Sequence, residues 1–148
     1  TMNFWSWDPS LSVGIEIIDR QHQRIVDYIN DLHSAHLEKD QDKVSAVLAG
    51  LRDYTLTHFT FEEDLMESSG YPLSETHKMV HNSFVAHLDK LVEQHENGKD
   101  VSRKLMSMLQ VWLTNHIKND DKDYSSIVKE MLSQHEGWFK RTANRLFR

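Results

Sequence analysis

The chain has 148 residues, a length typical of one domain, and its hydrophobic and charged fractions of 39% and 27% are ordinary for a globular protein. The absence of cysteine excludes disulfides and thiolate metal sites, and a net charge of −6 argues against a general nucleic-acid binder. No apolar run approaches the roughly 20 residues of a transmembrane segment, and no secretory signal is visible, so we expect a cytoplasmic protein. Ten histidines remain to be explained.

Apolar residues recur at helical spacing along most of the chain, after an aromatic N-terminal arm that contains Trp5 and Trp7. Asp19 is the expected N-cap of the first helix, and Gly70 the expected end of the second. Ser74 opens the third. The apolar runs cover residues 18–32, 44–66, 77–92, 101–117 and 127–132.

Four long helices joined by short polar connections favour antiparallel neighbours. The predicted fold is therefore all-α: an antiparallel up-down-up-down four-helix bundle with an N-terminal arm and a short C-terminal helix. We expect one domain, with the bundle and its arm in residues 1–136 and a basic amphipathic extension in residues 137–148.

The C-terminal extension differs in charge from the rest of the chain. Every acidic residue lies in residues 1–136, whereas the last twelve residues contain four basic side chains and no acidic one. Apolar residues recur there at helical spacing, at Phe139, Ala143, Leu146 and Phe147. The segment is expected to pack on the acidic bundle, or else to dock a protein partner or an anionic membrane surface.

Histidines fall on the inner face of all four predicted helices. A single histidine on such a face is typical of a hydrogen-bonded core residue, and a histidine four residues from a glutamate is typical of a surface pair. Five imidazoles and a carboxylate buried together without partners would cost several kcal/mol, so their combination predicts a metal centre. The residues concerned are His22, His58, Glu62, His77, His81 and His116.

The donor set narrows the choice of metal. Five imidazoles are too many for one tetrahedral zinc, and imidazole also suits iron, copper and nickel. Two ions that share carboxylates inside a four-helix bundle are a known arrangement for di-iron proteins. The ferritin-like version uses a Glu-x-x-His spacing, whereas this chain has His-x-x-x-Glu, so a different site is expected.

Four motifs in this order resemble the hemerythrin family: His22, then residues 58–62 (HFTFE), 77–81 (HKMVH) and 116–121 (HIKNDD). Residues 7–15 (WDPSLSVGI) resemble the bacterial members of that family, and the resemblance covers about residues 5–132. It implies two iron ions joined by an oxo or hydroxo group. By this resemblance His77, His81 and His116 hold one iron, His22 and His58 hold the other, and Glu62 and Asp121 bridge them.

The implied ligand Asp121 poses a geometric problem. Asp121 follows His116 by five residues, about 500° around an ideal α-helix, so the two residues do not share a face. Asp120 would share that face. Ligation by Asp121 therefore requires the fourth helix to distort or break, while Asp120 and Asp123 are expected to be solvated acids.

The resemblance implies reversible dioxygen binding at the iron with two histidines, by a carrier, storage or delivery protein rather than an enzyme. The alternatives are a sensor of oxygen, nitric oxide or redox state acting through the C-terminal segment, a di-iron peroxidase or oxidase, and an iron-handling protein. Nitric oxide or small anions would be further ligands. Apolar neighbours of the ligands would line a dry pocket, although each is equally typical of core packing: Ile25, Phe59, Trp112, Leu113 and Ile117.

Overall fold

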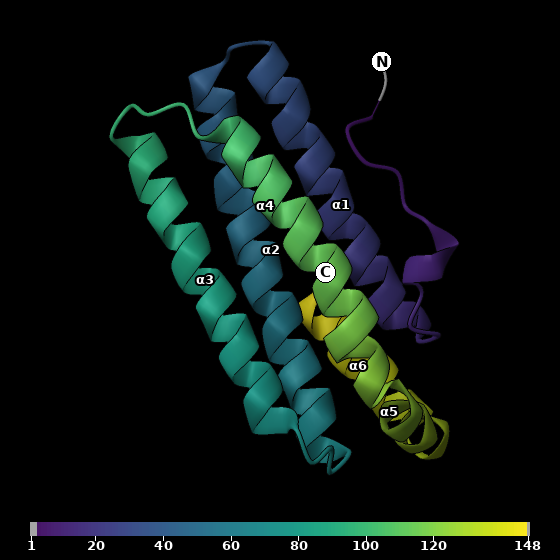
Figure 1. Cartoon of the computed structure of the whole chain (residues 1–148). Helices are drawn as coiled ribbons and strands as arrows, with labels where there is room; N and C mark the ends of the chain where they lie inside the picture. The colour runs from purple at the N-terminus through teal and green to yellow at the C-terminus, as the bar shows by residue number, and fades with distance from the viewer. Residues whose placement is uncertain (1–2, 148) are drawn as a thin grey trace.

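The computed structural model describes residues 3–147, apart from the side chains of residues 136, 138 and 139. The regular elements in chain order are η1 (Pro9–Leu11), α1 (Glu16–Leu37), α2 (Gln41–Ser68), α3 (Ser74–Glu96), α4 (Ser102–Asn115), the π-helix η2 (His116–Asp121), α5 (Lys122–Gln134) and α6 (Glu136–Leu146). Helices α1–α4 run alternately up and down in one bundle (Figure 1). The predicted antiparallel four-helix bundle is confirmed.

The ends of the helices follow local sequence signals. Gly70 has a φ of 71° just beyond the C-terminus of α2, a left-handed conformation that glycine adopts without steric cost. The prediction that Asp19 caps α1 is wrong, because the helix begins three residues earlier at Glu16. The Asp19 carboxylate instead accepts hydrogen bonds from Val13 N (2.9 Å) and Ser12 Oγ (2.6 Å), and so ties the N-terminal arm to α1.

The core of the bundle lies between the apolar faces of α1–α4 and continues under the N-terminal arm. Trp5 in the arm is buried, and its backbone exchanges two hydrogen bonds with the Asn30 side chain on α1 (2.9 and 2.7 Å). Tyr124 on α5 is completely buried. Within the described residues no helix is long and apolar enough to cross a bilayer.

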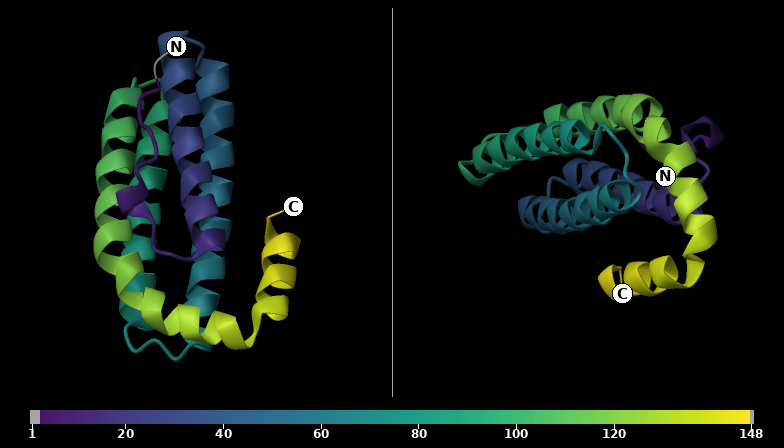
Figure 2. Two further views of the ribbon diagram at one scale, coloured as in Figure 1. Left: turned by 90° about the vertical axis from the view of Figure 1, so that its right-hand side faces the viewer. Right: turned by 90° about the horizontal axis from the view of Figure 1, so that it is seen from below.

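The C-terminal residues form a helix that folds back along the bundle. Helix α5 continues from the lower end of α4, and α6 turns upward beside α2 (Figure 2). Phe147 places its ring 5.5 Å from the rings of both Tyr54 and Phe61 on α2. Phe139, which was expected on the same apolar face, has its side chain outside the described part of the chain. The extension thus packs on the bundle through its last turn.

Candidate metal centre

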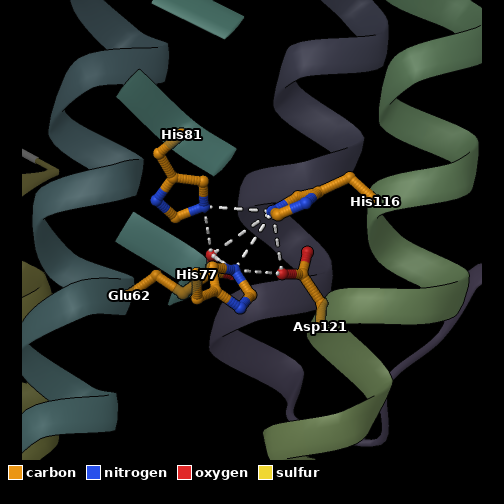
Figure 3. A group of neighbouring side chains, drawn as sticks. All are labelled: Glu62, His77, His81, His116 and Asp121. Atoms are coloured by element: carbon orange, nitrogen blue, oxygen red, sulfur yellow. Dashed lines mark hydrogen bonds and ion pairs between the residues drawn. The ribbon is translucent and has the colours of Figure 1, made fainter. Parts of the chain in front are cut away.

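Three histidines from two helices meet inside the lower half of the bundle. His77 and His81 lie one turn apart on α3, and His116 lies where α4 passes into the π-helix. Their Nε2 atoms converge, because His116 Nε2 is 3.1 Å from that of His77 and 3.0 Å from that of His81 (Figure 3). Such short distances between three ring nitrogens leave room for one shared cation or for protons.

In two of these rings the outer nitrogen, Nδ1, which points away from the common centre, has a carboxylate partner that fixes the position of the ring proton. His81 Nδ1 donates to Glu63 Oε2 at 2.8 Å, and His116 Nδ1 donates to Asp120 Oδ2 at 2.8 Å. Ionised carboxylates only accept hydrogen bonds, so the proton of each neutral ring is on Nδ1. The Nε2 lone pairs of His81 and His116 therefore face the common centre, as metal ligands require.

Two carboxylates lie between this group and a second pair of histidines. Glu62 Oε1 lies 2.9 Å from His81 Nε2, and Asp121 Oδ1 lies 3.1 Å from His116 Nε2. On the other side, Asp121 Oδ2 lies 3.1 Å from His22 Nε2, and Glu62 Oε2 lies 3.6 Å from His58 Nε2. Each carboxylate thus presents one oxygen to each half of the site, which is the arrangement that a pair of bridging ligands would have.

The π-helix brings Asp121 into the site. Residues 116–121 adopt i to i+5 hydrogen bonding, so the residue five positions after His116 returns to the same face. The predicted distortion of the fourth helix is present, as a π-helix rather than a break. The interpretation of Asp120 as a purely solvated acid is wrong, since it accepts the hydrogen bond of His116. Asp123 likewise accepts a hydrogen bond from the Tyr71 hydroxyl.

The donors fit metal ions better than they fit one another. Every side chain of the group is almost completely buried, and Glu62, His22 and Asp121 have no exposed surface. Several of these buried atoms make no hydrogen bond of acceptable geometry, namely His22 Nε2, His58 Nε2 and both Asp121 oxygens. Native proteins rarely leave so many buried polar atoms unsatisfied, and donors aimed at a common point are what cations need. Two groups with ligand atoms within 4.8 Å of one another result: Glu62, His77, His81, His116 and Asp121; and His22, His58 and Glu62.

Without a cation, protons on the histidines supply the positive charge beside the two carboxylates. Burial disfavours the charged form of His77 and His116, but close contacts with Asp121 and Glu62 outweigh burial and raise their pKa values to about 9 and about 11. The histidines around them, His58 above all for Glu62 and His116 for Asp121, hold the pKa values of both carboxyls well below the usual range, against the effect of burial. Burial dominates at His58 and lowers its pKa to about 3.

Several residues in contact with the site were missed by sequence reasoning. Tyr124 on α5 donates a hydrogen bond from its hydroxyl to Glu62 Oε2, at 2.7 Å. Gln21, next to a histidine of the site, is 2.6 Å through Oε1 from His58 Nδ1. Two of the partners could have been suspected from the sequence: Glu63 because it directly follows Glu62, and Asp120 because it lies four residues after His116. Tyr124 had no such signal.

The five apolar neighbours are distributed unevenly. Phe59 stacks on His81 with ring centroids 3.8 Å apart, and Trp112 stacks on His116 at 4.4 Å. These two rings therefore contact the half of the site that has three histidines. The other three neighbours are buried in the core, and their place in a dry pocket stays a prediction: Ile25, Leu113 and Ile117.

Comparison with known proteins agrees with this geometry. The family described as "Hemerythrin HHE cation binding domain" matches residues 13–128. Bacteriohemerythrins from Stenotrophomonas maltophilia and Pseudomonas aeruginosa are 41% and 40% identical, each over 95% of this chain and 96% of the relative. A solved structure titled wild-type hemerythrin superposes with a TM-score of 0.80 at 28% identity, over 84% of this chain and 98% of that one. The chain belongs to the hemerythrin family.

Proposed function

We propose that this chain binds dioxygen reversibly at a non-haem di-iron centre. In this proposal His77, His81 and His116 hold one iron, His22 and His58 hold the other, and Glu62 and Asp121 bridge them. The observation that carries the proposal is the unequal number of nitrogen donors around two carboxylates that face both ways. The half with two histidines has one protein ligand fewer, which leaves a position for a small molecule.

The chain's own residues would set the conditions for reversibility. Ferrous iron, when bound, supplies the affinity for dioxygen and the electrons on which that binding draws. The two carboxylates offset part of the positive charge of two ferrous ions, and burial keeps bulk water away from the centre. Tyr124 holds Glu62 by its 2.7 Å hydrogen bond, which fixes the orientation of that carboxylate. Nitric oxide and small anions are expected to compete for the same position.

An optical experiment tests the proposal. The metal-free protein is loaded with ferrous iron under argon, exposed to air, and then freed of oxygen. We expect a visible absorption band that appears with air, disappears on degassing and returns over repeated cycles. A band that forms once and does not reverse would overturn reversible binding and favour a peroxidase or oxidase.

Metal loading should release protons. His77 and His116 are protonated at neutral pH in the metal-free protein, because their pKa values are about 9 and about 11. A metal ion must displace these protons. Its apparent affinity should therefore rise with pH through the pKa of His77 at about 9 and on toward that of His116 at about 11. An indicator dye in weakly buffered solution measures the release, and competition with a chelator measures the affinity. An affinity that does not change with pH would contradict this expectation.

A second candidate function, an oxygen sensor, is favoured by the contact of the C-terminal segment with α2. Phe147 packs against Phe61, which directly precedes Glu62 in the sequence. A shift of Glu62 on ligand binding would therefore be felt one residue away from the surface on which α6 rests.

Hydrogen exchange distinguishes the sensor from the carrier. In a sensor, amide protection of α6 should differ between the oxygenated and oxygen-free forms, and Phe147→Ala should abolish that difference by removing the ring between α6 and α2. Equal protection of α6 in both forms would contradict the sensor.

A further inference from the structure

The histidines in the two halves of the centre have different hydrogen-bond partners. In the half with three histidines, the outer nitrogens of His81 and His116 each donate to a carboxylate at 2.8 Å, from Glu63 and Asp120 respectively. A carboxylate that accepts the outer proton of an imidazole makes the inner nitrogen a stronger donor to a metal. This half therefore has two electronically strengthened ligands.

The half with two histidines lacks this support. His58 Nδ1 contacts the amide oxygen of Gln21 at 2.6 Å, and an amide carries no net charge. His22 Nδ1 is buried and has no hydrogen-bond partner among the described residues. Neither ring has a carboxylate behind it, so both are weaker donors than His81 and His116.

Ring stacking adds a second difference. The Phe59 ring lies parallel to His81, with 3.8 Å between centroids and 4° between planes, and Trp112 covers His116 at 4.4 Å and 18°. His22 and His58 meet edge to face at 4.8 Å and 74°. Face-to-face packing holds His81 and His116 in the ligating orientation before any metal arrives, which lowers the ordering cost of binding.

We infer that the two halves of the centre fill in order, the half with His77, His81 and His116 first and the half with His22 and His58 second. Glu63 and Asp120 are the positioning residues that set this order. The inference rests on the proposed two-metal site but not on its reaction with oxygen. It predicts a form of the protein that holds one ion, always in the half with three histidines.

A titration with cobalt(II) under argon tests the order, because cobalt(II) reports each added ion by its visible absorption. At a fixed, mildly alkaline pH, the metal-free protein should take up two ions in two resolved steps. His58→Ala should keep the first step and lose the second. A His58→Ala variant that loses the first step would overturn the assignment of the halves.

Conservative variants test whether the carboxylates behind His81 and His116 set the filling order. Glu63→Gln and Asp120→Asn should each weaken the first step about 10- to 100-fold, the range found when an outer partner of a metal ligand is lost. Gln21→Glu, which places a carboxylate behind His58, should strengthen the second step and narrow the gap between the two. Glu67→Gln is the matched control, because it is an exposed glutamate one turn beyond Glu63 on α2. Circular dichroism verifies that each variant keeps its helices.

The outcomes separate this inference from the proposed function. Two ions taken up in a single step of equal affinity, or a Glu63→Gln variant that behaves like Glu67→Gln, would overturn the filling order and leave reversible oxygen binding intact. Uptake of fewer than two ions by the unaltered chain would overturn both. Two ordered steps in a protein that oxidises irreversibly in air would support the order and overturn the oxygen carrier.

Discussion

His77→Ala should reduce the iron content from two ions per chain to one or none, and should abolish the oxygen-dependent absorption band. His77 Nε2 lies 3.0 Å from both Glu62 Oε1 and Asp121 Oδ1, so this one ring contacts both carboxylates that the two halves share. In the proposed centre its loss removes one of three nitrogen donors to one iron and frees the carboxylates to move. The expected loss of affinity exceeds the roughly 10- to 100-fold cost of losing an outer partner.

The matched control is His87→Ala on the same helix. His87 is exposed and lies ten residues further along α3, so its removal should leave both iron content and absorption unchanged. Iron analysis and visible spectra after reconstitution under argon make the comparison. A His77→Ala variant with two irons at full occupancy would refute the ligand set.

The bundle and its ligand faces were predictable because they depend on helical periodicity alone. His77 and His81 are four residues apart, and His58 and Glu62 have the same spacing, so each pair must share a face wherever a helix forms. The sequence also indicated that Asp121 could serve only if the fourth helix changed its winding. The sequence did not indicate that the distortion would be a π-helix rather than a break, because that depends on which side chains Asp121 faces across the bundle.

Two of the outer partners could not be predicted, because each reaches a histidine on another helix. Glu63 on α2 contacts His81 on α3, and Gln21 on α1 contacts His58 on α2. These pairs depend on how the helices are rotated against each other, which a single sequence does not encode in any local pattern. His95 makes the same point, because it lies buried at the end of α3 in contact with Ser45 Oγ on α2 at 2.8 Å.

Removal of the metal should lower the melting temperature by about 15–30 °C. A ligand that binds only the folded state stabilises it by about 4 kcal/mol at a thousandfold excess over its Kd, so two such sites contribute about 8 kcal/mol. In a chain of this size each kcal/mol corresponds to about 2–4 °C. The structure gives the reason for a large effect, since the metal-free site keeps unpaired nitrogens of His22 and His58 and both oxygens of Asp121 in the core.

Circular dichroism melting curves of the iron-loaded protein, with and without a strong chelator, measure the shift. The metal-free form also has to keep two carboxylates and their protonated partners inside the core, so it should melt over a broader range as the lower ends of α3 and α4 separate first. The His77→Ala variant provides the control, because its melting temperature should respond much less to the chelator. Equal melting temperatures for the loaded and metal-free forms would mean that the buried donors satisfy one another, and the metal centre would then lose its physical basis.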